Sequence, residues 1–279
     1  MILIADSGST KTDWRIIDQS KKIHQASTQG FNPYFQEATT ITENLKKELL
    51  PFLPNEMVRK VYFYGAGCSN AEKIKVIETA LENVFPGVSV EVEHDLLAAA
   101  RALCGNKPGL VAILGTGSNS CLFDGKAIVE NIASLGFILG DEGSGAHIGK
   151  TFIQAYLNKE LPVEISENFY SRFKLAKDDI LEAIYKKPLP NRFLASFSKF
   201  IYQNSNNSVI NSLLIKCFEE FFDKHICKYK NDDGLKLNIV GSVGFYFSNI
   251  IRRVAQNKGI EIEIILESPI AGLTLYHTE

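Results

Sequence analysis

The sequence lacks an excess of charge of either sign. Its 279 residues include 30 Lys and Arg against 32 Asp and Glu, so the formal net charge is −2. The lysines gather only in short runs such as Lys46-Lys47 and Lys186-Lys187, which are typical of solvated faces. Without a basic patch, the sequence gives no electrostatic reason to expect nucleic acid or a membrane surface as a partner.

Long apolar runs are also missing. No segment is long enough to span a bilayer, and the N-terminus enters a strand pattern at once, without the basic region and apolar core of a signal peptide. We therefore expect a soluble, cytoplasmic protein with no membrane partner.

Cysteine is scarce, and the five cysteines show no CxxC spacing. An odd number of scattered cysteines is typical of free thiols in a reducing compartment and does not favour a zinc site. Hydrophobic residues, in contrast, make up 45% of the chain. This content and the chain length predict two compact lobes, each with its own core.

The most informative stretch is residues 2–17, which reads ILIADSGSTKTDWRII. Two apolar runs flank a turn of small residues, which predicts a β-hairpin. A turn without bulky side chains lets backbone N–H groups approach an anion closely, and Thr10 and Lys11 add a hydroxyl and a cation. Asp6 would repel a phosphate unless Mg²⁺ lies between them. An ordinary hairpin with a solvated turn is the alternative.

A second copy of this pattern favours the phosphate interpretation. Residues 111–123 read VAILGTGSNSCLF, with a Gly/Ser/Thr turn at the matching place between two apolar runs. Internal repetition predicts related structural units. Two such hairpins, one opening each half of the chain, suggest two related domains that hold a polyphosphate between them.

These hairpins resemble those of the sugar kinase/heat-shock ATPase/actin superfamily, in which two hairpins grip the phosphates of ATP from opposite sides of a cleft. Within it, GTGSN followed by GDEGS at residues 140–144 is similar to the N-acetylglucosamine kinase group. That group shares a sequence family with the activator ATPases of benzoyl-CoA reductases and 2-hydroxyacyl-CoA dehydratases. The resemblance covers nearly the whole chain and is strongest over residues 2–150.

The resemblance implies an α/β, two-lobed actin-like ATPase fold, made of duplicated ribonuclease H-like domains with an interlobe cleft. The N-terminal lobe would comprise residues 1–103 together with a closing helix at 269–279. The C-terminal lobe would comprise residues 104–268, with a helical insertion at 151–230 that often carries oligomer contacts in the superfamily. We expect the aromatic residues of this insertion to lie in a core, and we expect a homodimer.

Two residues of the first lobe have two interpretations each. Asp95 follows a predicted strand and opens a helix, so it is either a helix N-cap or a general base facing a cleft, and the two roles are compatible. Ligands bind outside the carboxyl ends of strands in open α/β sheets, which favours the base, and the resemblance also places the catalytic Asp here. Asn32 is either an Asn-Pro turn residue or, as the resemblance implies, a sugar contact. His94 is expected to be a packing residue.

Two glycine-rich segments of the second lobe are also candidates. Asp141 can accept hydrogen bonds from two sugar hydroxyls, and the resemblance places it and the backbone near Leu135 and Gly136 against the sugar, with Glu142 behind. The turn GSVG at residues 241–244 leads from a strand into a helix and matches the adenosine motif of the superfamily. A tight strand–helix turn is the alternative.

The expected site therefore has three parts. The nucleotide- and phosphate-binding residues are Ser7, Gly8, Ser9, Thr10, Lys11, Gly115, Thr116, Gly117, Ser118, Gly241, Ser242 and Gly244. The sugar-binding residues are Asn32, Asp95, Leu135, Gly136 and Asp141. The metal residue is Asp6.

Residues 144–151, SGAHIGKT, are one residue away from a P-loop. The mismatch is Ser144, which stands where a glycine is needed for the phosphate-wrapping turn. We therefore do not interpret this segment as a P-loop.

These features predict a kinase that transfers phosphate from ATP, with Mg²⁺, to the 6-hydroxyl of an N-acetylhexosamine, foremost N-acetylglucosamine, with Asp95 as general base. The identity of the amino sugar is left open. One alternative is an activator ATPase with an iron–sulfur cluster between two subunits, but Cys104 and Cys121 flank or lie inside strands. Another is a non-catalytic amino-sugar sensor, against which the presence of Asp6, Asp95 and Asp141 argues.

Overall fold

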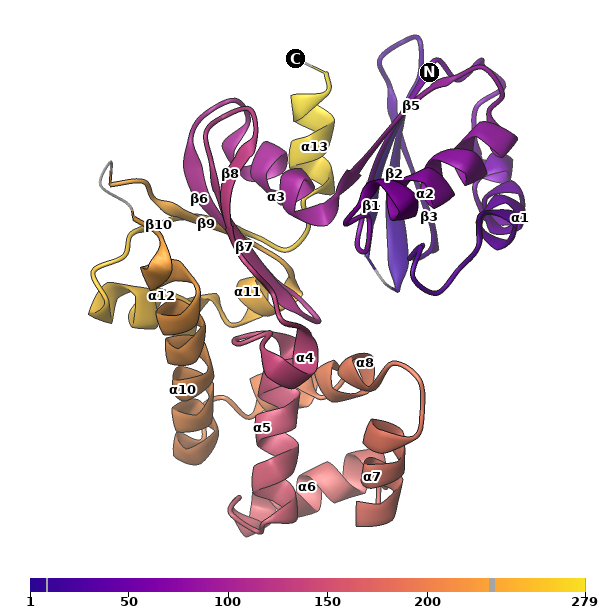
Figure 1. Ribbon diagram of the computed structural model, residues 1–279. Helices are drawn as coiled ribbons and strands as arrows, with labels where there is room; N and C mark the ends of the chain where they lie inside the picture. Colours follow the sequence, from indigo (N-terminus) through magenta and orange to yellow (C-terminus); the bar gives the residue numbers. More distant parts are fainter. Residues whose placement is uncertain (9, 231–233, 279) are drawn as a thin grey trace. The chain divides into compact units, whose positions relative to one another are not determined.

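The computed structural model describes residues 1–8, 10–230 and 234–278, and the chain divides into two compact units (Figure 1). The first unit consists of residues 1–106 and 269–279, and the second of residues 107–268. The first division therefore falls at 106–107, where the sequence analysis expected 103–104. The interlobe cleft stays a prediction.

The first unit contains a five-stranded sheet in the order β3-β2-β1-β4-β5. Its strands are β1 (Ile2–Ser7), β2 (Lys11–Ile17), β3 (Ile23–Gln29), β4 (Lys60–Gly65) and β5 (Ser89–His94). The first three strands are antiparallel, whereas β1, β4 and β5 run parallel. The hairpin predicted from residues 2–17 is confirmed as the pair β1–β2.

Helices cover both faces of this sheet, as Figure 1 shows. They are α1 (Ala38–Glu48), η1 (Leu50–Phe52), α2 (Ala71–Val84), α3 (Asp95–Cys104) and α13 (Ile270–Tyr276). Successive side chains of a strand point to opposite faces, so β1 contributes to two cores. Leu3 packs with residues of α1 and α2, and Ile4 packs with residues of α3 and α13.

A cluster of aromatic and charged residues fixes the end of α13 to this unit. The ring of His277 stacks on Tyr62 with the ring centroids 3.6 Å apart, and its Nε2 lies 2.7 Å from the hydroxyl of Tyr64. Arg101 of α3 donates to the same hydroxyl over 2.6 Å and to Glu91 over 3.1 Å. Burial and the positive charge of Arg101 lower the pKa of His277 to about 4.

We expect this unit to lose stability as the pH falls from about 6.5 to about 4, because unfolded His277 takes up a proton in that range and folded His277 does not. Thermal unfolding between about pH 7 and pH 4.5 measures the effect. The melting temperature of His277→Gln should fall less over this range than that of the wild type. Tyr64→Phe keeps the buried histidine and should keep the wild-type slope. Equal slopes for the wild type and His277→Gln would contradict the prediction.

The second unit repeats the sheet of the first. Its strands are β6 (Gly109–Leu114), β7 (Ser118–Phe123), β8 (Ile128–Ile132), β9 (Leu237–Val240) and β10 (Ile262–Leu266). Their order is β10-β9-β6-β7-β8, so both sheets place their first strand in the centre, an antiparallel hairpin on one side and parallel strands on the other. The α/β fold with two related domains is confirmed.

Helices make up most of the second unit between β8 and β9. The helices of this unit are α4 (Gly136–Leu139), α5 (Gly145–Leu157), α6 (Val163–Phe173), α7 (Lys177–Tyr185), α8 (Pro190–Ala195), α9 (Ser198–Gln203), α10 (Ser208–Lys224), η2 (Ile226–Lys228), α11 (Ser242–Tyr246) and α12 (Ser248–Asn257). Figure 1 shows α10 beside α12. The core position expected for the aromatic residues is confirmed for Phe218, Phe221 and Phe222, whose exposed fraction is 0%, but it is wrong for Tyr170, Tyr185 and Tyr202, which are 52%, 80% and 43% exposed.

The segment that differs from a P-loop by one residue is the first half of α5. Ser144 is the N-cap of this helix, and its Oγ accepts the N–H of His147 over 3.1 Å. The helix continues without interruption to Leu157, so no phosphate-wrapping loop forms. Among the helices of the described ranges, none has both the length and the apolar character that a membrane crossing needs.

Candidate functional site

In the first unit, three parallel strands end at one edge of the sheet. Ser7 at the end of β1 lies opposite Gly65 of β4, and Gly65 lies opposite His94 of β5. Asp95 follows directly as the first residue of α3. The first hairpin turn and Asp95 therefore follow parallel strands that end at the same edge of the sheet, which is where open α/β sheets bind ligands. Ser9 of this turn lies outside the described residues.

The N-cap of α3 is His94, so the N-cap interpretation of Asp95 is wrong, and His94 has a capping role where a packing role was expected. The Nδ1 atom of His94 accepts the N–H of Leu97 over 3.2 Å, whereas Asp95 already belongs to the helix. The capping bond therefore does not use the carboxylate of Asp95. Burial raises the pKa of Asp95, while the charge of His94 acts in the opposite direction. A carboxylate with a raised pKa is better suited to accept a proton near neutral pH.

Ser7 supports the first turn from within. It is fully buried, its Oγ lies 2.7 Å from Oγ1 of Thr12, and the same Oγ accepts the N–H of Phe31 over 3.1 Å. Its hydroxyl thus connects the turn to the loop that carries Asn32, and the structure does not present it to a ligand.

The exposed part of the first turn contains Gly8 and Thr10. The N–H of Gly8 donates to the carbonyl of Lys11 over 3.0 Å and closes the turn. The Nζ of Lys11 lies 2.7 Å from Asp13, so part of its charge is compensated within β2. Among the described residues, no group of three or more His, Cys, Asp or Glu side chains could hold a metal alone. The single Asp6 fits Mg²⁺ nevertheless, because this ion is usually bound by one or two carboxylates together with waters and phosphates.

Asn32 is a turn residue at the same edge of the sheet. Its Oδ1 accepts the N–H of Tyr34 over 3.0 Å, and its own N–H donates to Gln36 over 2.9 Å. Gly67, two residues after β4, has a φ of +85° and lies so close that a Cβ there would be 2.6 Å from Asn32 Oδ1. The turn interpretation is confirmed, and the side-chain amide nitrogen is the group left to donate to a sugar.

In the second unit, the turns after β6 and β9 touch each other. The two strands are paired and parallel, so they end at the same edge. Gly241 follows β9 with a φ of +123°, and a Cβ there would overlap the carbonyl of Leu114 at the end of β6. Both expected nucleotide motifs of this unit therefore lie side by side.

The start of α5 supports the turn after β6. The N–H groups of Gly145 and Ala146 donate to the carbonyls of Gly115 and Thr116 over 2.8 and 3.0 Å. Ser118 closes the turn with an exposed fraction of 4%, and its Oγ has no hydrogen-bond partner among the described residues. Buried hydroxyls nearly always have a hydrogen-bond partner, so a bound ligand could supply the partner that the Ser118 hydroxyl lacks.

The carboxylate of Asp141 lies against this turn. Its Oδ1 accepts the hydroxyl of Ser134 over 2.9 Å and the N–H of Ser118 over 3.4 Å. A Cβ on Gly117 would be 3.0 Å from Asp141 Oδ2, so a side chain at Gly117 would crowd the carboxylate. Asp141 itself has a φ of +58°, a left-handed conformation that costs a non-glycine residue about 1–3 kcal/mol. Strain of this kind clusters at functional sites.

Leu135 and Gly136, the other two expected sugar contacts, follow Ser134 in the chain. Both are exposed, and α4 begins at Gly136, which has a φ of +72°. They therefore belong to the loop that ends at Asp141, although no described contact joins them to its carboxylate.

A cavity of about 390 Å³ lies beside the turn after β9, between α9 and α11. It is lined by Ser198, Lys199 and Tyr202 from α9 and by Ser242 and Tyr246 from α11, with the two tyrosine rings 5.7 Å apart. Its size and its mixture of aromatic and polar groups suit a nucleobase. The sequence analysis missed the α9 residues because the whole helical segment had the pattern of a core.

Gly244 has a packing role in this turn. It is buried, and a Cβ there would be 2.7 Å from the side chain of Ile239. Its missing side chain lets α11 approach β9 closely. Among the four residues of the turn, Ser242 is the exposed one and faces the cavity.

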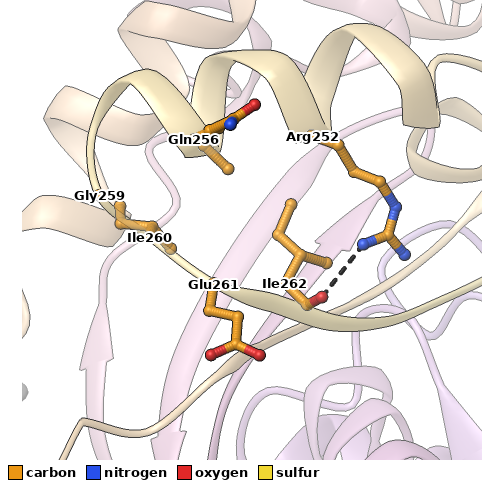
Figure 2. A pocket seen from close by; sticks show the side chains of 7 residues that line it. Arg252, Gln256, Gly259, Ile260, Glu261 and Ile262 are labelled. Atoms are coloured by element: carbon orange, nitrogen blue, oxygen red, sulfur yellow. Dashed lines mark hydrogen bonds between the residues drawn. The ribbon is translucent and has the colours of Figure 1, made fainter.

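A second cavity, of about 400 Å³, lies where α12 ends and β10 begins (Figure 2). Arg252, Gln256 and Glu261 line it, and the guanidinium of Arg252 donates to the carbonyl of Ile262 over 3.0 Å. None of the residues expected from the sequence lines this cavity, so we do not include it in the candidate site.

Solved structures share this fold along its whole length. A protein from Porphyromonas gingivalis, described as a candidate N-acetylglucosamine kinase, is 44% identical, with a TM-score of 0.95 over 99% of this chain and 98% of the other. A protein from Chromobacterium violaceum with the same description is 16% identical, with a TM-score of 0.76 and coverage of 99% and 98%. A glucokinase of the ROK family from Streptomyces griseus, solved with glucose and AMPPNP, is 15% identical, with a TM-score of 0.60 and coverage of 99% and 100%. The last two similarities concern the fold alone. Neither a model of a known protein family nor a curated protein matches the chain.

Proposed function

This chain belongs to the N-acetylglucosamine kinase-like family of carbohydrate kinases, within the actin-like ATPase superfamily, and from this membership we propose that it transfers the γ-phosphoryl group of ATP to the 6-hydroxyl of N-acetylglucosamine. The observation that carries the proposal is the unpartnered, buried hydroxyl of Ser118, the residue that ends the glycine-rich turn after β6 and whose N–H donates to the carboxylate of Asp141 over 3.4 Å. A phosphate oxygen would accept the hydrogen bond that this hydroxyl does not make in the protein.

The glycine-rich hairpin turn of each unit is a candidate for binding the nucleotide phosphates. The backbone N–H group of Gly117 and the hydroxyls of Thr10 and Thr116 would donate to the phosphates, which attract such donors strongly. The N–H groups of Gly8 and Gly115 close their own turns, and the missing side chains of these two residues would let the phosphates approach closely. The adenosine would occupy the cavity between α9 and α11, beside Gly241 and Ser242. Lys11 would add positive charge, and Ser7 and Gly244 would keep the turns in shape.

Asp6 is the residue that would hold Mg²⁺, which, when bound, would neutralise charge on the phosphates. The sugar would be held by Asn32, by Asp141 and by the loop at Leu135 and Gly136. Asp95 would accept the proton of the 6-hydroxyl as this oxygen forms its bond to the γ-phosphorus. ADP leaves with the electron pair of the broken bond. Because phosphoryl transfer needs little covalent assistance, these residues act mainly by positioning and by electrostatics.

A coupled assay of ADP release over a panel of amino sugars tests the proposal. We expect release to depend on the sugar and to be fastest with N-acetylglucosamine, compared with N-acetylmannosamine, N-acetylmuramic acid and glucosamine. Phosphorus–proton couplings in the NMR spectrum of the product would identify the phosphorylated hydroxyl. ADP release that no sugar stimulates would contradict the proposal and support an activator-type ATPase. Sugar binding without ADP release would support a sensor.

We also propose a homodimer in the cytoplasm, and light scattering of the purified protein tests the dimer.

A further inference from the structure

We propose that the end of α10 holds the carboxylate of Asp141 in place by acting through Glu142. Lys224 and His225 would thus be positioning residues for the site, although neither is expected to contact a substrate. The consequence for catalysis rests on the proposed function, whereas the mechanical coupling from α10 to Asp141 does not.

Glu142 directly follows the strained Asp141 and is anchored by two side chains of the end of α10. Its Oε1 lies 2.9 Å from Nζ of Lys224, and its Oε2 lies 3.0 Å from Nε2 of His225. The Glu142 side chain is only 8% exposed and that of His225 only 4%. A buried carboxylate is costly unless donors satisfy it, so this contact fixes both the charge and the backbone that carries it.

The contact residues of α10 form one face. Phe221, Lys224 and His225 are spaced i, i+3 and i+4, which places their side chains on the same side of a helix. Phe221 packs on the backbone after Glu142, where Gly143 has a φ of +73° and a Cβ would be 2.7 Å from the Phe221 side chain. Glu142 and Gly143, the two residues that follow Asp141, therefore both contact the end of α10.

A second chain of contacts returns from α10 to the same loop. Glu220 lies 3.8 Å from Lys224 and 3.5 Å from Nε2 of His147. The Nδ1 atom of the same imidazole accepts the N–H of Gly143 over 3.1 Å. Since Nδ1 accepts, the proton of a neutral His147 lies on Nε2 and points at Glu220. Glu142 and Gly143 are thus held from two sides.

This anchoring matters because Asp141 has an unfavourable backbone conformation. A non-glycine residue in the left-handed region relaxes unless its surroundings determine it. If Glu142 moved, the peptide between the two residues could rotate, and the Asp141 carboxylate would leave Ser134 and the N–H of Ser118. The sugar would then meet a carboxylate that is misplaced or mobile.

Steady-state kinetics of Glu142→Gln and Lys224→Met test the consequence. We expect the KM for N-acetylglucosamine to rise about tenfold while kcat falls less than about threefold and the KM for ATP stays near the wild-type value. Lys224→Arg keeps the cation and should restore most of the sugar affinity. Asp223→Asn is the matched control, because Asp223 lies next to Lys224 on α10 but pairs with Lys258 at the end of α12 and does not touch the loop. An unchanged sugar KM in Glu142→Gln would overturn the inference.

Amide hydrogen exchange separates this inference from the proposed function. The N–H groups of Gly143 and Ser118 should exchange about tenfold faster in Glu142→Gln than in the wild type, while amides in the centre of β6 keep their rates. If the wild type released no ADP with any amino sugar but these two amides responded, the proposed function would fall and the coupling would stand. Unchanged exchange at both amides would overturn the coupling, whatever the activity.

Discussion

Replacing Asp95 with asparagine should lower kcat for sugar phosphorylation by about 10²–10⁴-fold, which corresponds to about 3–5 kcal/mol of transition-state stabilisation. Asparagine has nearly the shape of aspartate but cannot accept the proton of the acceptor hydroxyl. The fold should survive because the capping bond of α3 comes from His94 and not from Asp95. The KM for the sugar should change little. Steady-state ADP release at saturating sugar and ATP measures the effect.

Glu93→Gln is the matched control. Glu93 lies near the end of β5, two residues before Asp95, and burial also raises the pKa of its carboxyl. Removing this charge alters the local electrostatics without touching the proposed base, so kcat should stay within about threefold of the wild type. A near-normal kcat for Asp95→Asn, or equal losses in the two variants, would refute the assignment of Asp95.

The pH dependence gives Asp95 a second readout. A base acts only when it is deprotonated, so kcat/KM should fall as the pH drops through the pKa of Asp95 in the free enzyme. Burial raises that pKa above the ordinary 3.8, so the loss should begin at a higher pH than for an exposed aspartate. The remaining kcat/KM of Asp95→Asn should not show this fall at low pH.

Much of the fold could be predicted because its signals are local. The two hairpins are recognisable from apolar runs around turns of small residues, and both are confirmed as β1–β2 and β6–β7. The ends of elements depend on contacts that are harder to recognise in the sequence. The helix α1 begins only at Ala38, because the carbonyl of Asn32 accepts the N–H groups of Phe35 and Gln36 and keeps them in the preceding turn.

Roles that depend on distant partners could not be predicted from the sequence. Lys224 and His225 reach Glu142 from 82 and 83 residues away, and no local pattern records that contact. Tyr202 lines a cavity with Tyr246 only because α9 and α11 come together in the fold. His94 has the sequence context of a packing residue, and its capping role follows from one extended backbone conformation, with φ −82° and ψ 158°.

Replacing Gly241 with alanine should destabilise the second unit by about 3 kcal/mol or more, because two costs of about 1–3 kcal/mol each add. The first is the backbone conformation, with φ +123° and ψ 153°, which is open almost only to glycine. The second is the overlap of the new methyl group with the carbonyl of Leu114. That carbonyl cannot easily yield, since β6 is paired with β7 on one side and with β9 on the other.

Gly259→Ala separates the two costs. Gly259 lies in the same unit with a φ of +71°, but no atom lies within 4 Å of a Cβ built there. This variant should lose only the conformational cost, about 1–2 kcal/mol. Urea unfolding followed by far-ultraviolet circular dichroism measures both variants. Fluorescence of the single tryptophan, Trp14, would report on the first unit instead.

Where Gly241→Ala still folds, its KM for ATP should exceed that of Gly259→Ala, because the methyl group separates the two nucleotide turns. Equal stability losses in the two variants would mean that the close approach of Gly241 to Leu114 carries no energetic weight.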